Sequence, residues 1–447
     1  MRFAQKCCSV DEIAATLREL FPLCRSLTGQ GNRETLRVLG EIIPLRVHEY
    51  PSGVKAYDWV IPDEWTAREA WIQDASGRRL VDFSVNNLHL VSCSIPVRGA
   101  FTLAELTRRL HWREDLPQAI PYRTSYYKRD WGFCISFEQY QRDFATQPDG
   151  TLFEVCVDTV FDKGSLSVGE LLIPGAVEQE ILLSTYFCHP SLANDNLSGV
   201  VLTAYLAREL MRRRLKYSYR VVFAPETIGA VAYCAHNEAA MKAVDCGFVI
   251  TCTAGKGPWG YKASIDEGHR VNRIVEDAFT EFSLPVLRYP FDPHGSDERQ
   301  YASPGFRINT VTISKDKYYE YKEYHSSLDT LDFISADAVA DTMLLYLRVL
   351  EKLEDEIFYQ SLNPHCEPML SPRGLYPSTG GGMMPGWNSD RQLDAILWLM
   401  MLCDGKTSVQ DIAARTSLPF AELCEMAALL AEKGLLGRLP FPAKRRA

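Results

Sequence analysis

The chain has 447 residues, of which 46% are hydrophobic and 23% are charged, with 28 glycines and 24 prolines. This length and composition exclude a small disulfide scaffold and a disordered or fibrous chain, and they leave room for roughly two to four folded domains. The formal charge of −9 argues against nucleic acid or an anionic membrane surface as the main partner.

The thirteen cysteines are scattered, and no two of them form a CxxC pair. This usage predicts reduced, buried thiols in a cytoplasm. The N-terminus leads directly into a helical pattern, without the apolar stretch and cleavage site of a signal peptide. The most apolar later run, residues 396–403, is far shorter than the roughly 20 residues that a membrane-spanning helix requires. We therefore expect a soluble, cytoplasmic protein with no membrane partner.

Residues 10–45 predict two amphipathic helices joined by a polar turn, and we assign residues 1–48 to the first part of the main domain. From residue 49 to residue 128 the sequence changes to short aromatic or β-branched segments separated by Pro, Gly and Asn. This pattern predicts a small β-rich module inserted into the main domain.

Residues 129–358 carry the rest of the main domain, in which apolar strands alternate with amphipathic helices. Continuous apolar strands of this kind predict an α/β fold with a mostly parallel or mixed sheet sandwiched by helices. Binding sites of such folds lie at the carboxyl ends of the strands. The predicted strands are at 152–161, 180–189, 219–227, 246–254 and 308–314.

Residues 359–388 are rich in Pro and Gly and predict a linker. Three short helical patterns and a strand-prone tail follow in residues 389–447, which indicates a winged-helix domain. This tail has eight Lys and Arg residues against seven Asp and Glu residues, a net charge of +1. Such a balance favours packing or homo-oligomerisation through the tail over nucleic-acid binding, and DNA binding is the alternative.

Four polar motifs follow predicted strands or turns: CHPSLANDNLSG (188–199), PETIGA (225–230), HGSDERQY (294–301) and YHSSLDT (324–330). Zinc favours nitrogen and oxygen ligands with one position left open for water, and His189, Asp195 and His325 could supply three such ligands. Glu226 would then take a proton from water that the metal activates.

Each of these residues also has an ordinary structural interpretation. Asp195 could cap a helix, Asp297 could close a turn, and His189 before a proline could end a strand. Taken singly, such roles are more frequent than metal binding. Taken jointly, imidazole and carboxylate groups at four successive strand ends favour a metal site.

The order of these motifs resembles the zinc aminopeptidase superfamily, which also contains glutaminyl cyclases and related carboxypeptidases. The resemblance covers about residues 180–335 and rests on five elements in one order, which are His189, Asp195-Asn196-Leu197-Ser198-Gly199, Glu226, Ser296-Asp297 and His325 with Asp329-Thr330. Over its whole length the chain looks like a family of aminopeptidase-like proteins with an inserted β-rich domain and a winged-helix tail. The motifs that carry this resemblance over the whole length include FPLCRSLTG, DWVIPDEW, NNLHLVSCSIP and IPYRTSYY.

Three departures from the superfamily pattern bear on the metal. Ser191 stands where the superfamily usually has an Asp, Glu226-Thr227 replaces a Glu-Glu pair, and Thr251 and Thr253 lie where a second-metal Asp is usual. The resemblance therefore implies one zinc per chain more readily than two, held by His189, Asp195 and His325.

In this interpretation Glu226 is the general base, and Asp297 holds the substrate amine or tunes Glu226. If Glu226 instead binds the metal, Asp297 becomes the candidate acid and base.

The resemblance implies a metallo-aminopeptidase-like hydrolase that acts on a small peptide or an aminoacyl amide. Two alternatives remain open. The first is a peptidase fold without hydrolysis, acting as a sensor or scaffold, which the missing second-metal carboxylates favour. The second is aminoacyl transfer or cyclisation at a single zinc.

Overall fold

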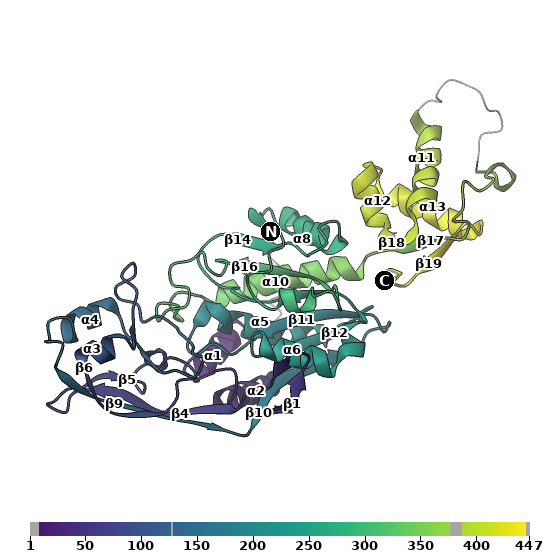
Figure 1. Cartoon of the computed structure of the whole chain (residues 1–447). Coiled ribbons are helices and arrows are strands. Elements are labelled where there is room, and N and C mark those ends of the chain that lie inside the picture. Colours follow the sequence, from purple (N-terminus) through teal and green to yellow (C-terminus); the bar gives the residue numbers. More distant parts are fainter. Residues whose placement is uncertain (1–8, 127, 376–386, 444–447) are drawn as a thin grey trace. The chain divides into compact units, whose positions relative to one another are not determined.

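A computed structural model describes residues 9–126, 128–375 and 387–443 (Figure 1). The chain divides after residue 349 into two compact units. No helix among the described residues is long and apolar enough to cross a membrane.

The first helix shows how the sequence sets the local structure of the first unit. Ser9 caps α1 in a capping box with Glu12, and the apolar residues Ile13, Leu17 and Leu20 form its buried face. The helices of this part of the chain are α1 (Val10–Leu20), α2 (Gln30–Ile42), α3 (Leu103–Thr107), α4 (Phe137–Asp143), α5 (Gly199–Leu210), α6 (Ile228–His236), α7 (Glu238–Met241), α8 (Arg270–Glu281), α9 (Glu298–Tyr301) and α10 (Ala336–Glu354), with the single turns η1 (Asn87–His89) and η2 (Ala193–Ser198).

The main sheet has eight strands in the order β1-β10-β12-β11-β13-β16-β14-β15. Its centre, β12-β11-β13-β16, is parallel, and the strands on either side are joined antiparallel at β10 and at β14. This confirms the mixed α/β sheet. The strands are β1 (Arg46–Pro51), β10 (Ser165–Ile173), β11 (Glu180–Tyr186), β12 (Ser218–Ala224), β13 (Val244–Val249), β14 (Trp259–Lys262), β15 (Val286–Tyr289) and β16 (Asn309–Lys315).

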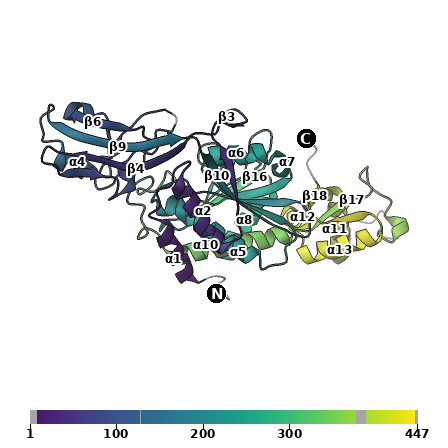
Figure 2. The same cartoon turned by 90° about the horizontal axis from the view of Figure 1, so that it is seen from below.

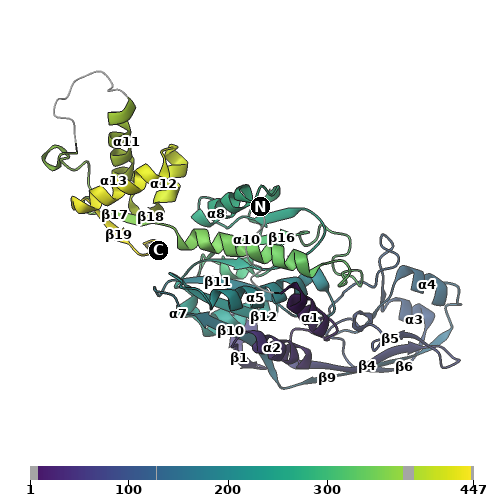
Figure 3. The ribbon, with the colours of Figure 1, turned by 180° about the vertical axis from the view of Figure 1, so that it is seen from behind.

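Helices cover both faces of this sheet, as the continuous apolar strands predict. Every residue of β11 and β12 is buried. Helix α6 packs on one face in a core cluster with Leu182 and Val222. Helix α5 contacts α1, α2, β11 and β12, and α1, α2, α5 and α10 stand together in front of the sheet in Figure 3.

The inserted module is a four-stranded antiparallel sheet in the order β5-β4-β9-β6 (Figure 2). Its bounds differ from the expected residues 49–128, because the long strand β9 pairs with both β4 and β6. The run 152–161 is therefore not a strand of the main sheet, and its alternating burial is typical of an antiparallel sheet with one covered face. The strands are β4 (Glu64–Gln73), β5 (Arg79–Asp82), β6 (Val97–Thr102) and β9 (Leu152–Asp162), and two small pairs join β2 (Lys55–Ala56) to β3 (Trp59–Val60) and β7 (Leu110–His111) to β8 (Phe133–Cys134).

In the described part of the second unit, a three-stranded sheet in the order β18-β17-β19 is accompanied by the α-helices α11, α12 and α13. Strand β17 and the buried Leu370 and Leu375 come from residues that we expected to form a linker, so this unit begins well before residue 389. Residues 376–386 of that linker lie outside the described part. The elements are β17 (Phe358–Ser361), η3 (Ser371–Arg373), α11 (Trp387–Leu402), β18 (Asp404–Ser408), α12 (Val409–Thr416), α13 (Phe420–Glu432) and β19 (Leu436–Leu439).

Candidate metal centre

The candidate residues gather at the carboxyl ends of the parallel strands. His189 follows β11, Asp195 lies in η2, Glu226 follows β12, and His325 lies in the loop after β16. Parallel strands end at the same edge of a sheet, so residues far apart in sequence meet there.

His189, Asp195 and His325 lie together and form the candidate metal centre, which we name the metal centre. One ligand atom from each lies within 4.8 Å of the others. Asp195 Oδ2 is 3.0 Å from His325 Nε2, yet both atoms are buried and neither has a hydrogen-bond partner of acceptable geometry among the described residues. Buried polar atoms normally have such partners. These two atoms contact one another as an ion pair, and with no hydrogen bond among the described residues and a second imidazole beside them they fit a bound cation.

The protonation states in this group suit metal binding. Burial lowers the pKa of His189 to about 4, so its imidazole is neutral at neutral pH. Although burial raises the pKa of Asp195, the neighbouring His189 and His325 lower it to about 2. A neutral imidazole and an ionised carboxylate are the forms that bind zinc.

Several buried groups orient Asp195. The Tyr186 hydroxyl donates to Asp195 Oδ1 at 2.5 Å. The Asp329 carboxylate accepts the backbone N–H groups of Asn194 and Asp195 at 2.6 and 2.9 Å, and it accepts the Tyr321 hydroxyl at 3.1 Å. Such outer contacts fix the direction of metal ligands. Asp329, which the sequence connected only with the His325 loop, thus supports the segment that carries Asp195.

His189 has different support. The buried Arg25 donates from Nε to the His189 carbonyl at 3.0 Å. Ser191 does not contact the imidazole, because its hydroxyl donates to the Phe21 carbonyl and accepts from Asn87. The His189 Nδ1 instead contacts the Cys188 sulfur at 3.6 Å.

Glu226 adjoins the metal centre through His189. Ligand atoms of Glu226, His189 and Cys188 lie within 4.8 Å of one another. Glu226 is partly exposed, whereas His189 and Cys188 are buried. Burial and the nearby Asp297 raise the pKa of Glu226 well above its usual value. A partly exposed carboxyl with a raised pKa beside a metal centre is suited to proton transfer.

Asp297 is not one of the candidate metal ligands, and it contacts the residue that follows Glu226. Its Oδ1 accepts the backbone N–H of Thr227 at 2.8 Å, while its Oδ2 is buried without a hydrogen-bond partner. Burial raises the pKa of Asp297 to about 7. Thr227 has a φ of +63°, a conformation that L residues seldom adopt. The structure thus connects Asp297 to Glu226 through the backbone of Thr227.

Thr251 and Thr253 are both buried at the end of β13. The Thr251 hydroxyl forms a hydrogen bond with Tyr186 at 2.7 Å, so it supports the ring that holds Asp195. Neither threonine brings a carboxylate to the site, and among the described residues neither belongs to a metal-binding group.

Tyr122, from the segment that follows the module's helix α3, is a site residue that the sequence did not indicate. Its ring lies 5.1 Å from the His189 ring and 5.2 Å from the His325 ring, centroid to centroid. Its N–H donates to the His325 carbonyl at 2.8 Å, and Pro121 pairs with Ser326 as an antiparallel bridge. The motif IPYRTSYY contained these residues, but aromatic content alone gave them no role.

We name residues 119–126 the module arm. Ile120 and Ser327 exchange two further hydrogen bonds, at 2.8 and 3.0 Å. These contacts fasten the loop in which His325 has a φ of +51°. The inserted module therefore helps to build the metal centre of the main domain.

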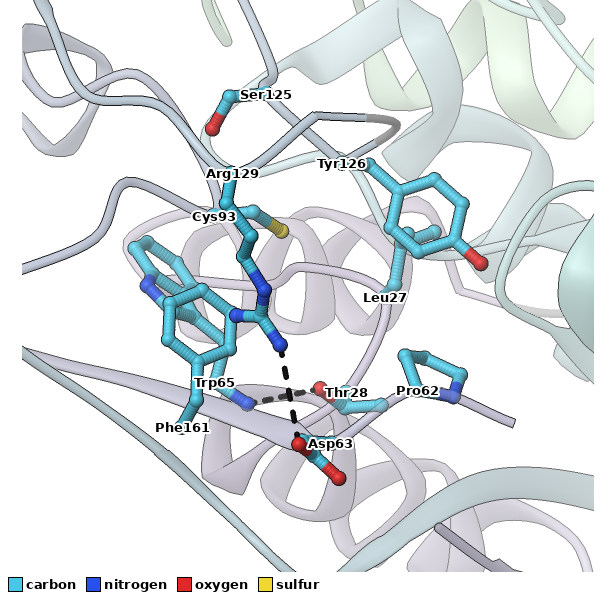
Figure 4. A pocket seen from close by; sticks show the side chains of 10 residues that line it. All are labelled: Leu27, Thr28, Pro62, Asp63, Trp65, Cys93, Ser125, Tyr126, Arg129 and Phe161. Carbon is cyan, nitrogen blue, oxygen red and sulfur yellow. Dashed lines mark hydrogen bonds and ion pairs between the residues drawn. The ribbon is translucent and has the colours of Figure 1, made fainter. Parts of the chain in front are cut away.

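A separate pocket lies between the α1–α2 connection and the inserted module (Figure 4). Arg129 lies 3.6 Å above the Phe161 ring and 3.8 Å from Asp63, so its charge already has partners. None of the metal-centre residues lines this pocket. Its lining joins the α1–α2 connection, the start of β4, the end of β9 and the module arm, and consists of Leu27, Thr28, Pro62, Asp63, Trp65, Cys93, Ser125, Tyr126, Arg129 and Phe161.

Solved structures share this fold. A crystal structure from Clostridium acetobutylicum, described provisionally as a peptidase, has a TM-score of 0.79 at 37% identity and covers 97% of each chain. A zinc aminopeptidase from Bacillus subtilis has a TM-score of 0.56 at 12% identity, covering 77% of this chain and 94% of that one. A peptidase M28 precursor from Shewanella amazonensis has a TM-score of 0.54 at 14% identity, covering 76% and 91%. The aminopeptidase-like fold is thereby confirmed.

Sequence comparisons agree with these structures. A protein of Clostridium acetobutylicum with the provisional name polysaccharide biosynthesis protein with aminopeptidase-like domain is 40% identical over 414 residues, which cover 92% of this chain and 93% of that protein. A winged helix-turn-helix model matches residues 357–438, which confirms the fold of the tail. Residues 14–356 match a family model described as a domain of unknown function, DUF4910, and the chain belongs to that family.

Proposed function

We propose that this protein is a zinc-dependent aminopeptidase-like hydrolase that cleaves a peptide or aminoacyl amide bond. The observation that carries this proposal is the group of His189, Asp195 and His325, in which Asp195 Oδ2 and His325 Nε2 lie 3.0 Å apart and neither has a hydrogen-bond partner among the described residues. The partly exposed Glu226 adjoins that group.

The ligand set supports zinc. Two imidazoles and one carboxylate form a common catalytic zinc site, and three protein ligands leave a position open. Zinc bound there supplies Lewis-acid polarisation of an amide carbonyl and increases the acidity of water.

Glu226 acts as the base in this proposal. It takes a proton from the attacking water and delivers it to the nitrogen of the leaving amine, so water is consumed and an acid and an amine are released. Asp297 raises the pKa of Glu226. A neighbouring divalent cation shifts that pKa in the opposite direction, towards the ionised form that a base requires.

Metal content tests the first part of the proposal. We expect inductively coupled plasma mass spectrometry to find about one zinc per chain, because the two candidate ligand groups of the described residues, one of His189, Asp195 and His325 and one of Cys188, His189 and Glu226, share His189. His189→Ala and His325→Ala should each lose the metal. His294→Ala is the matched control, because His294 is exposed and pairs with Asp292 outside the metal centre. A protein that takes up no zinc contradicts the proposal and favours a sensor or scaffold.

Turnover tests the second part. Glu226→Gln should lose about 10³-fold in kcat/KM on alanyl-glycinamide, because general acid–base groups contribute about 10²–10⁴-fold. The variant should retain its zinc. A fully active variant would exclude Glu226 as the base. Product mass spectrometry distinguishes hydrolysis, which adds one water, from aminoacyl transfer or cyclisation.

A further inference from the structure

Arg299 is an exposed cation close to the proposed base. It belongs to α9, two residues after Asp297, and its side chain faces solvent. Among the described residues Arg299 forms no ion pair, although many other arginines of the chain do. An exposed guanidinium with no carboxylate partner at a site is a candidate for ligand binding.

The position of Arg299 is tied to Glu226. Arg299 Nη2 donates to the Thr227 hydroxyl at 3.4 Å, and Thr227 directly follows Glu226. The Thr227 N–H donates to Asp297 at 2.8 Å. The Arg299 guanidinium thus contacts the residue that directly follows Glu226 in the chain.

The backbone that carries Arg299 is firmly anchored. The neighbouring Glu298 is buried, accepts the Thr312 hydroxyl at 2.5 Å and lies 3.9 Å from the buried Lys262. Lys262 in turn donates to the His294 carbonyl at 2.8 Å. These contacts hold α9 in place while the Arg299 side chain remains free to bind.

An exposed aromatic ring stands near the same charges. Tyr319 is 62% exposed and makes an edge contact with Tyr324 at 5.1 Å between ring centroids. The Tyr324 ring stacks on His325 at 3.9 Å. Besides burial, the Glu226 carboxylate raises the pKa of Tyr319 and the Arg299 cation lowers it.

We propose that Arg299 binds a carboxylate of the substrate that lies within one residue of the scissile amide. This inference rests on the proposed function and names its substrate class, which is short peptides or aminoacyl conjugates that carry such a carboxylate. A guanidinium forms paired hydrogen bonds with a carboxylate, and Arg299 has no carboxylate partner within the described chain.

Two kinds of substrate present this chemistry. The carboxylate belongs either to the leaving amine, as at the C-terminus of a dipeptide, or to the acyl side, as in an N-terminal aspartyl residue. Two matched pairs of probes separate them. Alanyl-glycine and alanyl-glycinamide differ only in the carboxylate of the leaving amine. Aspartyl-glycinamide and asparaginyl-glycinamide differ only on the acyl side.

The test measures kcat/KM for the four probes with the zinc-loaded full chain. We expect the carboxylate member of one pair to be preferred about 10- to 100-fold, which corresponds to one charge-assisted contact. Arg299→Gln should abolish that preference by lowering kcat/KM on the carboxylate member far more than on the neutral member. Arg299→Lys should keep part of it, because lysine retains the charge without the paired geometry. Arg307→Gln is the control, since Arg307 is exposed in the following loop.

The inference is overturned if wild type cleaves the probes with no preference for the carboxylate member of either pair. It is also overturned if such a preference survives in Arg299→Gln. In both cases the proposed function stands. Equilibrium binding of the same probes to the zinc-loaded Glu226→Gln variant provides a readout without turnover. A carboxylate preference in binding that depends on Arg299, combined with no cleavage by wild type, supports the inference and overturns hydrolysis. The absence of that preference in both binding and cleavage overturns the inference.

Discussion

Two groups of buried charges lie on the main sheet, and they are built in opposite ways. We name the first the arginine cluster, which consists of Arg220 on β12 with Glu170, Glu180, His48 and Tyr233 around it. The second is the metal centre. Both are buried, but the charged side chains of the arginine cluster are paired with one another within the chain.

Every nitrogen of the Arg220 guanidinium donates to a buried partner. Nε and Nη2 donate to the two oxygens of Glu180 at 2.5 and 2.8 Å, and Nη1 donates to Glu170 and to Tyr233. The other oxygen of Glu170 faces His48 Nε2 at 2.6 Å. None of these side-chain atoms is left unpartnered.

In and around the metal centre, by contrast, Asp195 Oδ2, His325 Nε2 and Asp297 Oδ2 are buried without hydrogen-bond partners among the described residues. Leaving buried polar atoms unpaired lowers stability, and proteins tolerate this where a ligand or a reaction uses those atoms. The comparison teaches that burial of charge alone does not identify a site. The distinguishing feature of the metal centre is that a carboxylate oxygen and an imidazole nitrogen, neither with a hydrogen-bond partner among the described residues, lie 3.0 Å apart.

The largest effect should come from breaking the arginine cluster. Arg220→Met leaves Glu170 and Glu180 buried without their cation, which should lower the free energy of unfolding by about 3–5 kcal/mol. Urea denaturation measures this loss. Arg37→Met, at an exposed helical ion-pair site, should leave the urea midpoint unchanged. If Arg220→Met were neutral, the arginine cluster would not be a stabilising element.

The opposite sign is expected for Asp297→Asn in zinc-free protein. The pKa of Asp297 is about 7 in the fold, whereas an unfolded Asp ionises near pH 4, so between these values the folded state binds more protons. The free energy of unfolding of wild type therefore falls as pH rises from 4 to 7. The Asp297→Asn variant should not show this decrease, because Asn does not titrate. By pH 8 the variant should be more stable than wild type by up to about 4 kcal/mol.

Urea midpoints at pH 4 and pH 8, measured in chelator, check this prediction. An equal shift at both values would mean that Asp297 does not titrate differently in the fold. Asp292→Asn is a suitable control, because hydrogen bonds from His294 lower the pKa of Asp292 and its removal should not stabilise the protein.

Asp195→Asn should affect metal binding more than folding. Asn keeps an acceptor for the Tyr186 hydroxyl but lacks the ionised oxygen, so we expect zinc affinity to fall at least about 100-fold. Competition with a chromophoric chelator measures this affinity. The Arg220→Met variant should bind zinc with unchanged affinity under conditions in which the variant is folded. Similar losses in both variants would show that the two clusters are not independent.

The smallest effect concerns the module arm. Tyr122→Ala removes the ring that contacts both histidines, which should weaken zinc binding about tenfold, in line with aromatic contact energies. Tyr122→Phe keeps the ring and should bind zinc as wild type does. Unequal zinc affinities for Tyr122→Phe and wild type would instead assign a role to the hydroxyl.

Much of the site could be predicted from the sequence. The alternation of strands and helices implied parallel strands, and the site residues follow those apolar strands. His189, Asp195 and His325 were grouped on this basis together with the family resemblance, and their ligand atoms lie together in the structure. Their roles as zinc ligands stay predictions.

Other features could not be predicted, for identifiable physical reasons. A short run such as 152–161 does not reveal which sheet it joins, since its partners β4 and β6 lie elsewhere in the sequence. The contacts of Tyr122 depend on backbone pairing with the distant His325 loop, and such pairing leaves no periodic pattern in the sequence. The φ of +63° at Thr227, which is neither Gly nor Asn, also had no sequence signal.

The pairing of the module arm with the His325 loop also constrains the order of events during folding. Ile120 and Ser327 are 207 residues apart in sequence. Closing so long a loop costs chain entropy, and contacts of this kind form slowly compared with local helices. During synthesis the histidine loop emerges long after the module, so the two cannot pair until about three quarters of the chain has been made. The proposed zinc site is therefore complete only after the module arm has paired with the His325 loop, late in folding.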